Sequence, residues 1–186
     1  MSAARDSDAP ADPTAVLTAP LPGRPCSAAA ALHVVGEKWA LLAVREIFFG
    51  NHRFEAIARN TGAPRDRLAA RLRSLEQAGV VERRPYNERP PRYEYHLTES
   101  GRALAPVIRA LLDWGDRWVL EERPVVMVHE PDAGDGRSDA GHGERHAHDL
   151  DAAWVCRTCG EEIAMNTLSV DVRAPGWDRA GPVPPA

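Results

Sequence analysis

Two short helical segments joined by a glycine-containing link constrain the fold of this chain more than any other feature of its sequence. The first, RFEAIARNTG, places Phe54, Ile57 and Ala58 on one face and stops at Gly62. The second, residues 64–80, spaces three leucines and a glycine at i, i+4, i+7 and i+11, so that one stripe faces inward. Its opening proline suits a first helical turn. Together they predict a helix-turn-helix.

The flanking segments extend this prediction. Upstream, CSAAAALHVVG and EKWALLAVREIFFG have helix length, and a glycine ends each. Downstream, VVERRPY and RYEYHLT are typical of strands, with NERPP as the turn of a β-hairpin wing. Thr98 is expected to cap one long helix over residues 99–122, whose wide apolar face indicates a dimer contact. The residues expected in the core of the first two helices are Leu32, Val35, Trp39, Leu42, Ile47 and Phe48.

The predicted fold class is therefore α+β and mostly helical: a winged helix-turn-helix with a two-stranded wing and helical dimerisation elements. Residues 1–24 are rich in Ala, Pro and Asp and are expected to form a disordered arm. Residues 25–123 form the predicted DNA-binding and dimerisation domain, and residues 124–186 a flexible acidic tail with a His-rich loop and a zinc-knuckle-like turn. No apolar run approaches the roughly 18 to 20 residues that span a bilayer. With no secretory signal at its start, the protein is expected in the cytoplasm with no membrane partner.

The net charge also differs between the predicted domain and the predicted tail. The net charge is −4, but residues 24–123 hold 17 Lys and Arg against 13 Asp and Glu, whereas residues 124–186 carry −6. From Arg65 to Arg92 there are eight arginines and four acidic residues. An arginine-rich helix fits the major groove of double-stranded DNA, where guanidinium groups pair with guanine or phosphate. The residues expected to contact DNA are Arg65, Arg67, Arg71, Arg73 and Ser74 on the second helix, and Arg84, Arg89 and Arg92 in the wing.

Residues 26–118 resemble the HxlR family of bacterial winged helix regulators. The resemblance is carried by Cys26, the Trp114–Gly115 pair and three longer segments, GEKWALLAVREIFFGNHRFEAI, LAARLRSLEQAGVVERRPY and PPRYEYHLTESGRAL. It implies a homodimer formed through the first and last helices, which represses or activates nearby genes. The chain departs from the family at Ala63, where a serine cap is common; loss of such a cap costs about 1 kcal/mol of helix stability.

Cys26 matches the position at which some members of this family place a thiol that senses oxidants or electrophiles. A helix N-terminus favours the thiolate form of a cysteine, which supports a sensor role. The alternative is a small cysteine that packs against the dimer partner and does not react.

Cys156 and Cys159, in VCRTCG, have the spacing of a zinc knuckle. The other predicted ligands are His129 and Asp132, although a carboxylate then stands where relatives of this tail carry a thiol, and His142, His146 and His148 are further nearby histidines. Zinc is thus the one cofactor that the sequence suggests. The alternatives are a relic turn that binds no metal and a thiol–disulfide function; the latter lacks a surrounding βαβ pattern.

Two other classes of function stay open. The basic helix could dock an acidic protein surface, since 22 of the 23 basic residues are arginine and some must lie on any exposed face. An enzyme is not expected, because the sequence contains no nucleophile elbow, phosphate-cradling glycine loop or HExxH motif. His33, on an apolar helix face, is expected in the core, and His52 and His96 at the surface.

Overall fold

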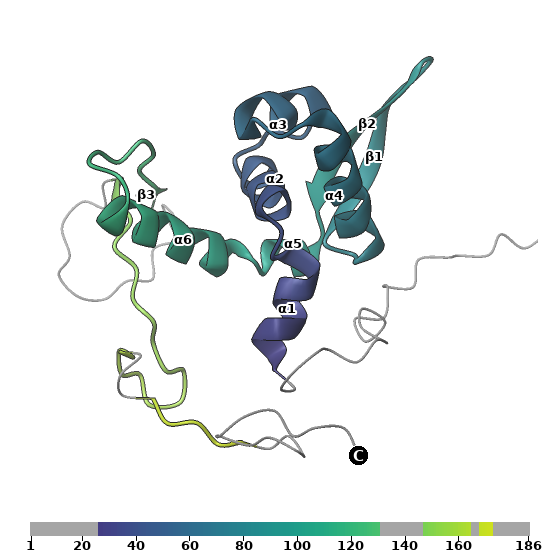
Figure 1. Ribbon diagram of the computed structural model, residues 1–186. Helices are drawn as coiled ribbons and strands as arrows, with labels where there is room; N and C mark the ends of the chain where they lie inside the picture. Colours follow the sequence, from purple (N-terminus) through teal and green to yellow (C-terminus); the bar gives the residue numbers. More distant parts are fainter. Residues whose placement is uncertain (1–25, 131–146, 165–167, 173–186) are drawn as a thin grey trace, which may run out of the picture. The chain divides into compact units, whose positions relative to one another are not determined.

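The computed structural model describes residues 26–130, 147–164 and 168–172, and within them the chain forms two compact units, residues 26–112 and 113–172 (Figure 1). The predicted arm, Asp132, His142 and His146 lie outside the described residues. The first unit holds helices α1 (Ser27–Val35), α2 (Lys38–Phe48), α3 (Phe54–Thr61) and α4 (Arg65–Gln77), strands β1 (Val81–Glu88) and β2 (Pro91–Leu97), and helix α5 (Glu99–Arg102).

Helices α2, α3 and α4 build the core of the first unit. Ala43 and Val44 of α2, Ile57 of α3 and Leu68 and Leu72 of α4 are fully buried. The three-leucine stripe of α4 therefore faces inward, as its spacing predicts. Two expected core residues differ: Leu32 is 61% exposed and Phe48 is 37% exposed. His33 is exposed as well, because α1 buries only Val35 among its nine residues.

The link between α3 and α4 is the tight turn of a helix-turn-helix. Gly62 ends α3 in the left-handed region at φ +68°, which glycine adopts without steric cost. The amide of Ala63 then donates to Thr61 Oγ1 at 3.2 Å, and α4 begins at Arg65 with no side-chain cap. The N-cap is Pro64, one residue after Ala63, where the sequence placed the missing serine cap.

A buried carboxylate ties α2 to α3. Glu46 is only 4% exposed, and its oxygens accept hydrogen bonds from Arg45 Nη2 at 2.6 Å, Asn51 Nδ2 at 2.8 Å and Asn60 Nδ2 at 2.9 Å. Three residues that donate to one carboxylate satisfy a charge that would otherwise be costly to bury. This network fixes the start of the turn that precedes α3.

Strands β1 and β2 form the predicted antiparallel hairpin, which extends beyond the helices (Figure 1). The predicted five-residue turn is wrong: pairing continues through Glu88 and Pro91 and leaves only Arg89 and Pro90 in the turn. Proline is tolerated as the first residue of a strand, so Pro91 did not prevent the pairing. Leu97 is buried at the base, whereas Tyr93 near the tip is 43% exposed.

The single long helix expected over residues 99–122 is also wrong. It is divided into α5 and α6 (Ala105–Trp118). Pro106 explains the break, because a continuous helix needs an amide hydrogen there to bond the carbonyl of Arg102. The amide of Leu120 donates to Gly115 O at 3.1 Å, a bond that closes α6 at Trp118 instead of extending it. Thr98 caps α5 as expected, accepting a hydrogen bond from the Gly101 amide at 3.3 Å.

In the part of the second unit that the structure describes, two short pairings follow the end of α6. Strands β3 (Val128–His129) and β4 (His148–Asp149) pair antiparallel, and a separate bridge joins Val155 to Glu162 around the two cysteines. Among the described residues, no single helix is long and apolar enough to cross a membrane; α1 and α2 meet that criterion only as a pair bent by 79°.

Candidate nucleic-acid interface

Helix α4 presents its polar face to solvent because its leucines fill the core. Arg65, Arg67, Arg73 and Ser74 are exposed, and Arg71 is half-buried. Ser74 Oγ donates to the carbonyl of Ala70 at 3.1 Å, which leaves its lone pairs as acceptors. The structure thus brings the five predicted α4 residues to one helix, four of them freely accessible.

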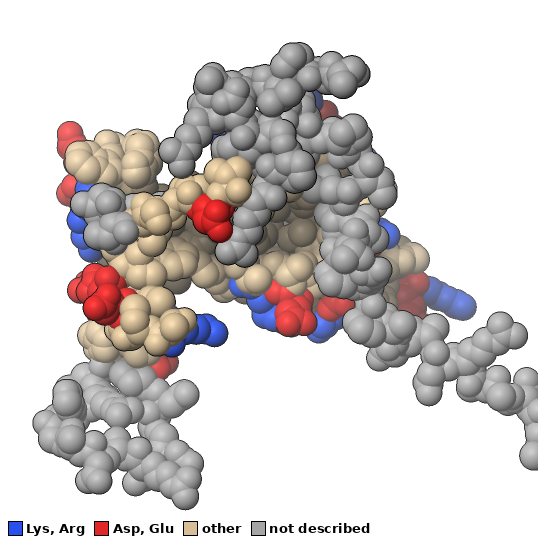
Figure 2. All heavy atoms as spheres, turned by 90° about the horizontal axis from the view of Figure 1, so that it is seen from below, with Lys and Arg blue, Asp and Glu red and all other residues tan. Residues whose placement is uncertain are grey.

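Several arginines of this surface are paired with acidic side chains. Figure 2 shows one face of the molecule, seen from below in the view of Figure 1, and on it basic and acidic side chains lie next to one another. Arg65 forms a bidentate pair with Glu55 of α3, with both N–O distances at 2.6 Å, and lies over the ring of Phe54. The hydrogen bonds from Arg65 hold the pKa of Glu55 below its ordinary value. Arg65 is therefore oriented before any ligand arrives.

The other predicted arginines differ in how they are held. Arg84 donates to Glu82 at 2.9 Å, along its own strand. Arg71 and Arg67 have only distant pairs, at 4.0 Å from Glu37 and Asp66 respectively. Among the described residues, no ion pair involves the remaining three, which are all exposed: Arg73 on α4, and Arg89 and Arg92 at the hairpin tip.

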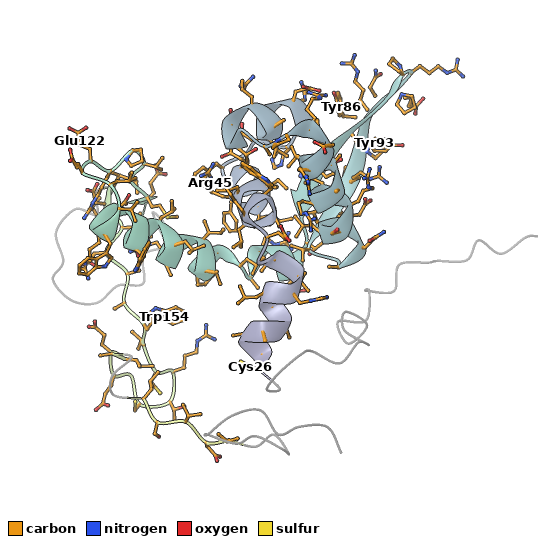
Figure 3. All side chains as sticks on the ribbon, viewed as in Figure 1. Cys26, Arg45, Tyr86, Tyr93, Glu122 and Trp154 are labelled. Carbon is orange, nitrogen blue, oxygen red and sulfur yellow. The ribbon has the colours of Figure 1, made fainter. Side chains whose placement is uncertain are left out.

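A groove of about 580 Å³ lies between the start of α3 and the wing. Arg53 lines it, with its guanidinium 4.7 Å from the centre of the Tyr86 ring and its Nε 3.1 Å from Glu94 Oε1. Arg53 also pairs with Glu94 through the backbone, which attaches the start of α3 to β2. Figure 3 shows Tyr86 and Tyr93, which also line the groove, on the hairpin. Sequence reasoning missed Arg53; its place directly before the first helix of the motif was the available signal.

His52 and His96 form a second contact between the α3 region and the wing. Their rings stack with centroids 4.3 Å apart, and His52 Nδ1 lies 2.9 Å from the carbonyl oxygen of Tyr95. Both side chains are half-buried, so the expectation that they lie at the surface holds only in part. Together with Arg53, this stack holds the wing in place relative to the helix-turn-helix.

The three cysteines fall in two places. Cys26 precedes α1 as its N-cap, half-buried and with no side-chain hydrogen bond to the helix. Cys156 and Cys159 occupy a tight turn of the second unit, where the backbone amides of Cys159 and Thr158 donate to Cys156 and lower the pKa of its thiol. His129 lies in β3, its ring perpendicular to that of His148 at 5.3 Å. The described residues contain no cluster of three or more metal-ligating side chains, and Asp132 falls outside them.

A helix-turn-helix with an exposed arginine face, followed by a basic β-hairpin, defines a winged helix DNA-binding regulator of transcription. Comparison with known proteins gives the family. Residues 34–123 match the model of the HxlR-like helix-turn-helix family. The HTH-type transcriptional regulator Rv3095 of Mycobacterium tuberculosis is 41% identical over 140 residues, which is 75% of this chain and 80% of that protein. The chain belongs to the HxlR-like helix-turn-helix family.

Solved structures agree with this assignment. PA1607, described as a candidate transcription factor, is 31% identical with a TM-score of 0.62, and the match covers 78% of this chain and 94% of that one. PA1374 of Pseudomonas aeruginosa, described in the same way, is 27% identical with a TM-score of 0.51, covering 83% and 97%. The winged helix-turn-helix predicted from the sequence is thereby confirmed.

Proposed function

We propose that this regulator binds a pseudo-palindromic operator as a homodimer and represses the adjacent gene by blocking transcription. Helix α4 would enter the major groove, and the wing would lie along the backbone or the minor groove. The observation that carries the proposal is that α4 has one buried face and one exposed face. Its leucines are buried. On the exposed face, Arg73 points away from the core and forms no ion pair with an acidic side chain among the described residues.

The proposed dimer rests on an apolar stripe along α6. Val107, Leu111, Trp114 and Trp118 follow each other at i, i+4, i+7 and i+11, and they are 44%, 50%, 60% and 70% exposed. This spacing keeps four large side chains on one side of a helix, the pattern with which two helices pack together. Elsewhere in the first unit, Leu32 of α1 is a further exposed apolar side chain. A second copy of the chain is the occupant we propose, because two recognition helices then read the two halves of an operator.

Mobility-shift binding to the chain's own upstream DNA tests the function. Specific binding is expected to exceed binding to random duplex by about 10³-fold or more at physiological salt. Equal binding to both duplexes would overturn the proposed operator binding and favour an acidic protein partner.

A dithiol oxidoreductase is the other class of function to test. Such an enzyme would turn over a disulfide substrate, and loss of Cys156 and Cys159 would end that turnover.

Cys26 is the residue that we propose as the signal receiver. It is the only cysteine in residues 26–123, and Figure 3 places it at the far end of α1, away from Tyr86 and Tyr93 of the hairpin. Oxidation there would act on the proposed dimer contact and change the spacing of the two α4 helices, without touching DNA. A peroxide is expected to weaken the mobility shift of the wild type but not of Cys26→Ser. An unchanged response in Cys26→Ser would exclude Cys26.

A further inference from the structure

The turn that contains Cys156 and Cys159 has no part in the proposed DNA contact. It is closed by backbone hydrogen bonds: the amide of Cys156 donates to Glu161 O at 2.9 Å, and the amide of Gly160 donates to Cys156 O at 2.7 Å. The amide of Ile163 donates to Trp154 O at 2.7 Å, so a short hairpin continues on both sides of the cysteines. Gly160 sits at φ +77°, a conformation that most other residues adopt only with strain.

This backbone holds the two cysteines on one short loop. Cys156 and Cys159 are separated by two residues, and both lie between the paired residues Val155 and Glu162. That spacing on a tight turn is the one with which two sulfurs bind one metal ion. Cys159 is exposed and Cys156 half-buried, so both are accessible to an ion.

The charge around the turn favours a cation. Glu161 and Glu162 follow the second cysteine directly, and Glu161 Oε2 lies 3.9 Å from Cys159 Sγ. Residues 124–186 as a whole carry −6. Two thiolates on a fixed turn with a carboxylate beside them match the ligand preference of a soft divalent ion such as Zn²⁺.

We propose that the turn of Cys156 and Cys159 binds one thiophilic divalent metal ion per chain, with both sulfurs as ligands. On binding, each thiol releases its proton to solvent and forms a metal–sulfur bond, so the ion's two charges are balanced by two thiolates. The site is independent of the proposed operator binding and would hold the second unit in one conformation.

Co²⁺ is the probe for this site. Full-length protein is stripped with a chelator, reduced until three thiols titrate, and then given Co²⁺ without reductant. One Co²⁺ per chain is expected, with the intense thiolate-to-cobalt absorption and visible bands of a tetrahedral site, both lost when Zn²⁺ is added. Cys156→Ser and Cys159→Ser are each expected to lower Co²⁺ affinity by at least about 100-fold, more than loss of an outer-shell partner costs.

Cys26→Ser is the matched control, since it removes a thiol outside the turn and should leave the cobalt spectrum unchanged. The proposal is overturned if the fully reduced wild type shows no thiolate-to-cobalt absorption, or if Cys156→Ser retains it. Mobility shifts of the same preparations separate this result from the DNA-binding proposal, because specific binding with no cobalt site would reject the metal alone.

Discussion

Glu55 and Arg65 face each other across the turn of the helix-turn-helix as a bidentate ion pair with two N–O distances of 2.6 Å. The pair joins the first turn of α3 to the first turn of α4, at the end of α4 expected to approach DNA. Both side chains are well exposed, so the pair adds little to folding stability. Its effect is to fix the direction of a guanidinium and to place a carboxylate beside it.

Glu55→Gln should therefore release Arg65 for a phosphate and remove a negative charge from the interface. We expect tighter binding to operator and random duplex alike, and a log–log salt dependence steeper by about 0.9, the value for one added phosphate contact. Binding isotherms at several salt concentrations measure this slope. An unchanged slope would contradict the gain of a phosphate contact by Arg65 in this variant.

The ion pair of Glu55 and Arg65 is expected to break only at acidic pH. The Glu55 carboxylate is charged at neutral pH, and because Arg65 lowers its pKa the pair stays intact to a more acidic pH than an unpaired glutamate would allow. It is lost only as the pH falls through that lowered pKa, below the ordinary range of glutamate. NMR titration of the Glu55 side chain should show the shift in wild type and its loss in Arg65→Ala.

Arg73 and Arg92 should have different effects on specificity. Arg73→Ala on α4 is expected to cost about 1–3 kcal/mol on the operator and to relax the preference at one base pair, as for loss of a base contact. Arg92→Ala at the wing tip should weaken all sequences equally and reduce the salt slope by about one. The control is Gln77→Ala, an exposed residue at the end of α4. Equal losses of specificity in both arginine variants would contradict this assignment.

Leu111→Glu places a charge in the middle of the α6 stripe. Leu111 is half exposed in the single chain, so the fold should survive while the dimer dissociates. Sedimentation velocity should show a monomer, and the specific mobility shift should be lost with it. Asp116→Asn, on the opposite side of the helix by its 100° periodicity, should leave the dimer intact. A dimeric Leu111→Glu would locate the contact elsewhere.

Two glycines give a matched test of packing. A Cβ at Gly101 would lie 2.2 Å from the carbonyl oxygen of Val80 and 3.2 Å from the Leu97 side chain, whereas one at Gly115 meets nothing within 4 Å. Gly101→Ala should lower the free energy of unfolding by about 1–3 kcal/mol or more. Gly115→Ala, within α6, should raise it by about 0.5–1 kcal/mol. Urea unfolding measures both, and a neutral Gly101→Ala would contradict the close approach of α5 to Val80.

Much of the fold follows from local signals. The glycine after α3, the leucine period of α4 and the alternation before Thr98 each act within a few residues, so the helix-turn-helix and its wing could be predicted. Pro106 was such a signal too: it divides α5 from α6, but the apolar period running through it suggested one helix. Leu32 and Phe48 show the limit of this reasoning, since apolar character does not tell which face finds a partner.

The sequence by itself determined which residues of α4 point outward, because the helical period that buries the leucines also exposes the arginines. Only the tertiary structure decided which of those arginines form ion pairs with acidic side chains. Glu55 meets Arg65, Asn60 meets Glu46, and Arg53 meets Glu94 across 10, 14 and 41 residues of chain. Such pairs form where packed elements bring side chains within hydrogen-bonding distance. Local sequence patterns cannot predict them, because the partners are distant in the sequence.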